Sequence, residues 1–287
     1  MMKLLITGAT GFVGKSFIAE FKGEYEIHAL VRQTSSLSIS GINAHEYDGT
    51  IHSIKNALDG IDVVLHLATC YKAAHCEIDI LPMLEANVIF GVQLLEAMHQ
   101  TNVNRIVNVG TTWQKFECEH YNYANLYSAT KQAFQELLKF YVDANQWHCV
   151  NLHFNDTYGK DDHRKKIIQL LIESAKNSTS LDMSLGEQRF ETCYISDAIK
   201  ALDITIERVI RSTTPSNEEF SILTGDDTSL RELVDTVERI LVTPLKINWG
   251  ARPYRDREVM SVPYSNYKTL PNWEKKVSLQ DGIKKLL

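Results

Sequence analysis

Apolar and polar positions alternate in blocks along the first half of this chain. Short apolar runs, typical of strands buried on both faces, occupy residues 3–7, 26–31, 62–68, 105–109 and 149–154, with a weaker run at 45–48. Amphipathic segments between them predict helices at residues 12–21, 53–58, 82–100 and 125–145. This alternation predicts the α/β fold class, with a doubly wound parallel sheet covered by helices on both faces.

The pattern changes near residue 159. Beyond it the chain is polar and broken by prolines, with a helix ending near residue 176, a strand at 220–223 and a helix at 229–241. We therefore expect residues 1–158 to carry the sheet and residues 159–287 to form mainly a smaller C-terminal lobe. Open α/β sheets bind ligands outside the carboxyl ends of their strands, so this lobe is expected to bind the substrate.

A glycine-rich turn lies between the first strand and the first helix. Glycines in such a turn permit a tight bend, close approach of the backbone to a diphosphate, and close packing of helix on strand. The free N–H groups at the start of the helix favour the phosphates. The turn predicts a Rossmann-type dinucleotide site formed by Gly8, Thr10, Gly11, Phe12, Val13 and Gly14.

The end of the second strand indicates which dinucleotide binds. NAD-binding chains usually carry an acid there for the ribose 2′-hydroxyl, and residues 31–36 contain none. Arg32, with Ser35 nearby, suits a 2′-phosphate, so NADP(H) is expected rather than NAD(H). The alternative for Arg32 is an exposed arginine at a strand end.

Tyr127 and Lys131 are four residues apart in a predicted helix, so they share one face. A lysine cation beside a tyrosine stabilises the phenolate, which lets the phenol donate and accept a proton near neutral pH. Thr111 and Thr112, at the end of a strand, are candidates for a hydroxyl that polarises a carbonyl. The alternatives are a chance tyrosine–lysine spacing and threonines favoured by β-propensity.

Composition excludes several classes. The chain has 287 residues and a net charge of −6, with no dense basic block for nucleic acid. We see no apolar run near the ~20 residues that cross a bilayer and no signal peptide, so no membrane partner is expected. Five cysteines without a CxxC pair predict neither a metal site nor disulfides, and favour the cytoplasm.

Several segments together resemble the extended short-chain dehydrogenase/reductase family. They are TGATGFVG at 7–14, VLHLAT at 64–69, EANV at 85–88, NVGTT at 108–112, YSATK at 127–131, DTYGKDD at 156–162 and GEQRFETCYISD at 186–197. The resemblance implies a catalytic set of Thr111, Tyr127 and Lys131. Further cofactor contacts are implied for Asp48, Leu67, Ala68 and Asn87, in addition to Tyr127 and Lys131, and substrate contacts for Thr112, Trp113, Asp156, Arg164 and Arg255. For Asp48 the alternative is a turn residue before Gly49, and for Arg255 it is a surface arginine in a proline-rich tail.

The resemblance also implies that residues 192–208, approximately, return to the first domain. It implies a homodimer formed through helices near 83–100 and 125–145. Within the family the chain is most similar to CDP-abequose-synthase-type reductases. These imply NADPH-dependent reduction of the C4 ketone of a nucleotide-activated 4-keto-6-deoxyhexose, in deoxysugar biosynthesis for O-antigen lipopolysaccharide.

Some positions depart from the family pattern. The dehydratases' Thr-Asp-Glu is here Thr111-Thr112-Trp113, which lacks the carboxyl groups needed to eliminate water. The frequent Val-Tyr-Gly that follows is here Gln114-Lys115-Phe116. Two alternatives to a reductase remain: a nucleotide-sugar 4-epimerase with retained NAD, and a non-catalytic NADP(H)-sensing regulator.

Overall fold

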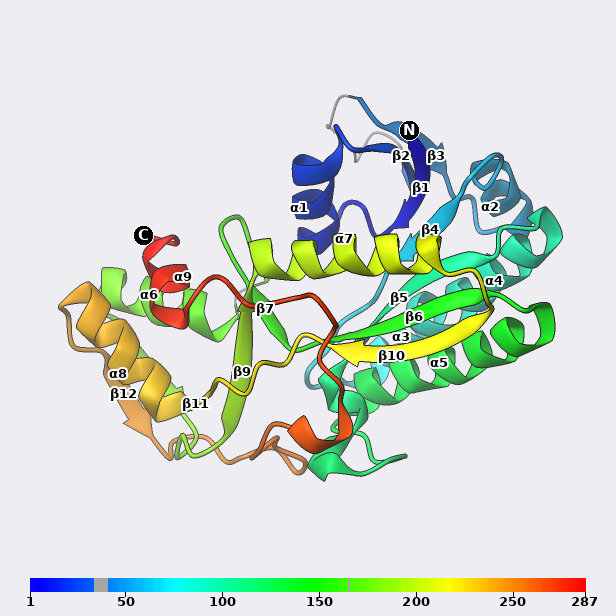
Figure 1. Cartoon of the computed structure of the whole chain (residues 1–287). Helices are drawn as coiled ribbons and strands as arrows, with labels where there is room; N and C mark the ends of the chain where they lie inside the picture. Colours follow the sequence, from blue (N-terminus) through cyan, green and yellow to red (C-terminus); the bar gives the residue numbers. More distant parts are fainter. Residues whose placement is uncertain (34–40, 165) are drawn as a thin grey trace.

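The main sheet has seven parallel strands. The computed structural model describes residues 1–33, 41–164 and 166–287. The strand order is β10-β6-β5-β4-β1-β2-β3. The bounds are β1 Met2–Thr7, β2 Tyr25–Val31, β3 Asn43–Glu46, β4 Val63–His66, β5 Arg105–Thr111, β6 His148–Phe154 and β10 Ser216–Ser221. Every pairing is parallel, which confirms the doubly wound α/β fold (Figure 1).

Helices cover both faces of this sheet. Successive side chains of a strand point to opposite sides, so an apolar strand presents apolar groups to both layers of helices. Leu4 and Ile6 of β1 belong to one buried cluster and Leu5 to another. The first cluster includes α1 Phe12–Phe21 and α7 Ile195–Arg211. The second includes α2 Ile51–Ala57, α4 Phe90–Thr101 and α5 Leu126–Asn145.

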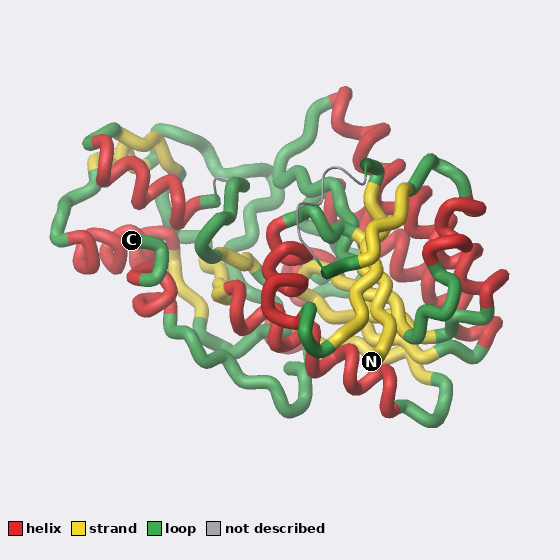
Figure 2. Tube along the Cα trace, turned by 90° about the horizontal axis from the view of Figure 1, so that it is seen from above, coloured by secondary structure: helices red, strands yellow, loops and turns green. Residues whose placement is uncertain are grey.

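The remaining elements form a smaller lobe beside the carboxyl ends of the strands (Figure 2). One three-stranded sheet contains β7 Asp156–Tyr158, β9 Arg189–Tyr194 and β11 Asp227–Ser229. A two-stranded sheet contains β8 Ser180–Met183 and β12 Lys246–Trp249. Its helices are α6 Ile167–Asn177, α8 Leu230–Leu241 and α9 Leu279–Lys284, and η5 Tyr264–Asn266 is a single 3-10 turn nearer the main sheet.

One helix begins earlier than the sequence pattern predicts. Instead of starting at Pro82, it starts at Glu77 as α3 Glu77–Leu84, continues through the π-helical turn η2 Glu85–Ile89, and runs into α4. The carboxylate of Asp79 accepts the backbone N–H of Cys76 at 3.1 Å and so caps the earlier start. Pro82 lies inside the helix, one turn before the π-helical turn.

This continuous helix, Glu77–Thr101, is long and apolar enough to cross a bilayer by length and composition alone, with a mean hydropathy of 1.5. The sequence pattern, which placed its start at Pro82, did not indicate such a span. Its second half packs on the sheet, where Leu94 and Met98 are fully buried. The second half is therefore a core helix of the α/β fold.

Two further differences concern strands. The weak strand expected at 45–48 is β3 Asn43–Glu46, so Asp48 follows the strand rather than ending it. The strand expected at 220–223 is β10 Ser216–Ser221, which pairs with β6 at the edge of the main sheet. Its polar residues gave little apolar signal, because edge strands are only partly covered.

Candidate active site

The glycine loop is shaped by close contacts. Gly8 has a φ of +74°, and a Cβ there would lie 2.7 Å from the backbone N of Ala68. A Cβ on Gly14 would lie 2.4 Å from the carbonyl oxygen of Gly8. Only glycine therefore permits these two approaches: Gly8 brings the loop against Leu67 and Ala68 after β4, and Gly14 brings the start of α1 against the loop itself.

The outer side of the loop is open. A Cβ on Gly11 would meet only the carbonyl oxygen of Gly8, at 3.3 Å. Gly11 is the N-cap of α1 and offers no side-chain cap, so the first N–H groups of the helix, at Phe12 and Val13, remain available. Thr10 is exposed beside them. An uncapped helix N-terminus behind a glycine cradle fits a diphosphate.

Asn87 fastens the segment after β4 to α5. Its Oδ1 accepts the backbone N–H of Cys70 at 2.7 Å and the hydroxyl of Thr69 at 3.0 Å. Its Nδ2 donates to the Cys70 carbonyl at 3.1 Å and to the Thr130 hydroxyl at 3.0 Å. The hydrogen-bonding groups of this side chain are thereby used within the protein, so Asn87 holds the segment after β4 against α5, and its predicted contact with the cofactor stays a prediction.

Tyr127 and Lys131 lie on the buried face of α5, which begins at the side-chain cap of Asn125. Burial is the main cause that raises the pKa of Tyr127 to about 12, against opposing effects of Thr69 and Arg164. Lys131 does not lower the pKa of Tyr127, so the expected stabilisation of the phenolate by Lys131 is not found in this structure. The protein's own groups therefore keep this phenol protonated at neutral pH, which suits a proton donor.

Lys131 is 3% exposed, and within the described parts of the chain no residue forms a hydrogen bond or an ion pair with its ammonium group. Burial lowers the pKa of Lys131 to about 8. A desolvated cation beside a buried phenol is a costly arrangement, and such arrangements concentrate at functional sites.

The two threonines at the end of β5 have different environments. The hydroxyl oxygen of Thr111 accepts the backbone N–H of Trp113 at 3.3 Å and caps η3 Thr112–Gln114, which precedes the short turn η4 Phe116–Cys118. Thr112 is 4% exposed and lines the cavity described next, whereas Thr111 does not.

A cavity of about 240 Å³ lies between the two lobes. Its walls combine side chains from the segments after β4, β5 and β6, from β7, from β9 and α6 with the residues just before them, and from the C-terminal segment. The aromatic, charged and amide side chains include Tyr71, Thr112, Trp113, Asn155, Asp156, Lys166, Gln188, Phe190, Glu191, Arg255 and Glu258. The ring of Tyr71 meets that of Tyr127 edge-on, with 5.0 Å between centroids. Tyr71 thus joins the cavity wall to the catalytic candidate.

The structure brings together most of the predicted substrate residues, but not all. Thr112, Trp113, Asp156 and Arg255 line the cavity. Arg164 is not among its lining residues, because its guanidinium makes two 2.7 Å hydrogen bonds to Asp162 and lies over the ring of Phe12.

The predicted adenosine contacts are separated from this cavity. Arg32 follows β2, is exposed, and has no hydrogen bond or ion pair with any residue in the described ranges. Ser35 lies outside the described residues. Asp48 is exposed, and its Oδ1 accepts the N–H and hydroxyl of Thr50 at 2.9 and 2.6 Å, which is the turn role left open above.

Asn155 was missed by the sequence analysis. It follows β6 and lines the cavity, yet neither its amide oxygen nor its nitrogen has a hydrogen-bond partner among the described residues. Buried amides without partners are rare, so this one is available to a ligand. Its position next to Asp156 is the one signal that the sequence offered. Tyr71 and Lys166 were missed because their segments, outside the sheet, carry no periodic pattern.

A parallel sheet, a glycine cradle at its first helix and a buried Tyr-x-x-x-Lys pair define a nucleotide-dependent enzyme of the extended short-chain dehydrogenase/reductase class. The chain belongs to the NAD dependent epimerase/dehydratase family, whose profile matches residues 4–222. It is 29% identical to the CDP-abequose synthase of Salmonella muenchen, over 99% of this chain and 97% of that protein. It is also 29% identical to that of Yersinia pseudotuberculosis, over 92% of each.

Solved structures of the same fold cover nearly the whole chain. The UDP-glucuronic acid 4-epimerase from Bacillus cereus, in complex with UDP-glucuronic acid and NAD, superimposes with a TM-score of 0.82 at 20% identity. The match covers 99% of this chain and 97% of that one. At this level of identity the match establishes the fold.

Replacement of Lys131 by methionine should stabilise the protein. The lysine binds its proton more weakly in the folded than in the unfolded state, with a pKa of about 8 against an ordinary 10.5. The free energy of unfolding therefore decreases as pH falls from 10.5 to 8, because the unfolded chain takes up this proton before the folded protein does. We expect Lys131→Met to gain on the order of 2–3 kcal/mol at pH 7, and to lose this gain above pH 10.5.

Urea unfolding across this pH range measures the effect. Lys139→Met is the matched control on the same helix, because its side chain is 55% exposed and pairs with Asp143. It should change stability by less than about 0.5 kcal/mol. A Lys131→Met variant less stable than the parent at pH 7 would contradict the account of Lys131.

Proposed function

We propose that this protein reduces the C4 ketone of a nucleotide-activated 4-keto-6-deoxyhexose with NADPH. The observation that carries the proposal is the buried, protonated Tyr127, whose ring contacts Tyr71 in the wall of the cavity between the sheet and the smaller lobe. The similarity to two CDP-abequose synthases along nearly the whole chain supports this substrate class. The expected place of action is the cytoplasm, in deoxysugar supply for O-antigen lipopolysaccharide.

The site fits a nicotinamide dinucleotide, because the uncapped start of α1 and the open side of Gly11 suit its diphosphate. The bound dinucleotide would supply the hydride. Tyr127 then donates its phenolic proton to the carbonyl oxygen of the sugar, and a threonine hydroxyl at the end of β5 donates a hydrogen bond to the same oxygen. Lys131 favours the phenolate left behind and holds the nicotinamide ribose.

The cavity walls suit a sugar diphosphate. Arg255 and Lys166, which pair with Glu258 and Asp156 of the same cavity, are the cations that a diphosphate would engage. Asn155 supplies an amide without a partner among the described residues. Trp113 stands where the dehydratases carry an acid. These walls hold and orient the nucleotide sugar, while Tyr71 and Trp113 exclude water from the reacting carbon.

An epimerase with retained NAD is the nearest alternative. It is disfavoured by the chain's similarity to abequose synthases and by Arg32 at the end of β2, where no acid stands. A non-catalytic sensor is disfavoured because a sensor has no need of a buried, desolvated lysine beside a tyrosine. Both alternatives share the fold, which by itself does not distinguish them.

We also infer a homodimer. Helices α3 and α5 are in contact, and both expose large apolar side chains. Ile78 is 81% exposed, Leu81 62% and Phe140 65%. Exposed apolar groups on adjacent helices are typical of a surface that a partner covers. A second copy of this chain fits, because its own α3 and α5 present the same surface.

Turnover tests the reaction. With a 4-keto-6-deoxy nucleotide sugar and NADPH, one NADPH should be consumed for each 4-hydroxy sugar formed. Tyr127→Phe keeps the ring but removes the proton, so its rate should fall by ~10²–10⁴. The control Tyr121→Phe changes a side chain that is 79% exposed and should keep full activity. Interconversion of two saturated nucleotide sugars, with NAD retained through purification, would establish the epimerase instead.

The threonine that assists Tyr127 is identified by comparing two isosteric changes. Thr111→Val should lower kcat strongly, because the family resemblance assigns the hydroxyl that binds the carbonyl to Thr111. Thr112→Val should have only a modest effect. The reverse ranking would assign the hydroxyl to Thr112, which lines the cavity.

Cofactor choice depends on Arg32. A charge-assisted hydrogen bond to phosphate contributes roughly 1.5–3 kcal/mol. Arg32→Ala should therefore weaken NADPH binding tenfold or more and leave NADH binding nearly unchanged. Fluorescence titration with both nucleotides measures this. An equal loss for both would show that Arg32 acts on the fold rather than on the 2′-phosphate.

Dimer formation is measured by sedimentation velocity. Leu81→Asp and Phe140→Asp each place a charge on the apolar helical surface and should yield monomers. Val242→Asp is the matched control, since Val242 is 89% exposed at the end of α8 in the smaller lobe. A parent protein that sediments as a monomer would refute the inference.

A further inference from the structure

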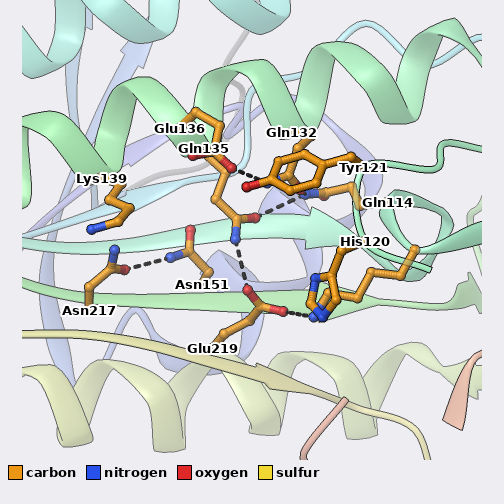
Figure 3. Close-up of a pocket in the computed structure, with 11 residues that line it drawn as sticks. Gln114, His120, Tyr121, Gln132, Gln135, Glu136, Lys139, Asn151, Asn217 and Glu219 are labelled. Carbon is orange, nitrogen blue, oxygen red and sulfur yellow. Dashed lines mark hydrogen bonds and ion pairs between the residues drawn. The ribbon is translucent and has the colours of Figure 1, made fainter. Parts of the chain in front are cut away.

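A second cavity, of about 190 Å³, lies on the α5 face of the sheet near the edge strand β10 and is lined by polar side chains. Gln114, Gln135 and Glu219 line it, and Figure 3 shows the side chain of Gln135 lying between the other two. Gln114 is 1% exposed and Gln135 9%. Buried amides at these levels are held by their hydrogen bonds, so the bonding pattern indicates what the cluster does.

Gln114 connects the end of β5 to α5. Its Oε1 accepts the backbone N–H of Thr111 at 2.9 Å. Its Nε2 donates to the Oε1 atoms of Gln132 and Gln135, at 2.8 and 2.9 Å. A Cβ on Gly110 would lie 2.7 Å from Gln114 Oε1, so the strand has a glycine where the amide approaches.

The connection reaches the face of α5 that carries the catalytic candidates. Tyr127, Lys131 and Gln135 follow at intervals of four residues, so they lie along one face of the helix. Gln114 therefore fixes the Thr111 strand end relative to the helix face of Tyr127. The distance between the two groups that must meet one carbonyl oxygen depends on this connection.

Glu219 gives the chain of amides its direction. Gln135 Nε2 donates to the Glu219 carboxylate at 2.9 Å, and Lys115 forms an ion pair with the same carboxylate. A carboxylate can only accept, so Gln135 must turn its nitrogen toward Glu219 and its oxygen toward Gln114. Gln114 must then present its nitrogen to Gln135 and its oxygen to Thr111. The carboxylate of Glu219 at one end and the backbone N–H of Thr111 at the other thus select the same orientation of both amides.

The Glu219 carboxylate is itself held in place and ionised. Burial alone would raise the pKa of Glu219, yet it lies below the ordinary value because His153, Lys115 and Gln135 favour the charged form. The ammonium of Lys115 also donates to the carbonyl of Asn266 at 2.9 Å and lies 4.2 Å from the ring centroid of Tyr267. The C-terminal segment therefore anchors the acceptor end.

We propose that Gln114 and Gln135 are positioning residues, which lock the Thr111 end of β5 to the catalytic face of α5 with a polarity set by Glu219. The proposal rests on the proposed reduction and on the role of Thr111 in it.

A polarity swap tests the lock. In Gln114→Glu, the Gln135 amide lies between two carboxylates and can donate to only one of them. The series of hydrogen bonds from Thr111 to Glu219 is therefore interrupted. Misplacement of Thr111 should lower kcat roughly tenfold to a hundredfold, while KM for NADPH stays within about twofold. Adding Glu219→Gln lets Gln135 reverse, because the new carboxylate at position 114 then accepts and the new amide at position 219 donates. The double variant should recover kcat to within about threefold of Glu219→Gln alone.

Two further comparisons separate positioning from general stability. In a Thr111→Val background, Gln114→Glu should cause no additional loss of kcat, since no hydroxyl remains to be placed. Gln100→Glu adds the same charge at an exposed position of α4 and should leave kcat unchanged. A folded Gln114→Glu variant with parental kcat, a loss that persists in Thr111→Val, or a double variant without recovery would each overturn the proposal.

Thermal unfolding of the same four proteins (parent, both single variants and the double variant) distinguishes failure of the lock from failure of the proposed function. If the two amides have the polarity described, Glu219→Gln lowers the unfolding temperature less in the Gln114→Glu background than in the parent, whatever reaction the protein catalyses. If the parent consumes no NADPH with any 4-keto sugar, the proposed function fails and this coupling alone judges the lock. A coupling of zero or of the opposite sign would then overturn it.

Discussion

The buried ammonium group of Lys131 is the constraint on which the site depends. A cation without a partner among the described residues costs stability, and burial lowers its pKa to about 8. The fold nevertheless holds it one helical turn from a phenol whose pKa burial raises to about 12. When Tyr127 gives up its proton, the phenolate that forms and the ammonium group of Lys131 stabilise each other, because each charge then has a partner of opposite sign. The free energy that the unpaired cation costs before the reaction is therefore reduced in the state in which the proton has left Tyr127.

The rest of the structure supplies positions for this pair. Seven parallel strands bring the glycine loop, the segment after β4 and the end of β5 to one edge of the sheet, and α5 packs against β5 and the η3 turn that follows it. Asn87 fastens the segment after β4 to α5, and Gln114 fastens the end of β5 to the same helix. The smaller lobe adds the cavity walls above that edge, so catalysis and substrate binding come from different parts of the chain.

Much of this was predictable because it follows from local patterns. The spacing of Gly8, Gly11 and Gly14 and that of Tyr127 and Lys131 are fixed by turn and helix geometry, and both motifs lie where the sequence placed them. The start of α3 was not predictable from apolar periodicity, because the cap of Asp79 determines it. Long-range contacts were also missed: the bonds from Gln114 to Gln135 and from Gln135 to Glu219 span 21 and 84 residues. Arg164 shows the converse, since a motif match did not indicate that Asp162 holds its guanidinium.

The central claim is that a hydride from the nicotinamide reaches C4 of a keto sugar while Tyr127 supplies the proton. The most direct measurement is NMR of the sugar formed when NADPH carrying deuterium at both hydrogens of nicotinamide C4 is incubated with an NDP-4-keto-6-deoxyhexose. The account predicts one deuterium at C4 of a single 4-hydroxy epimer, and far slower incorporation by Tyr127→Phe. A product without deuterium at C4, or two C4 epimers in equilibrium, would contradict it.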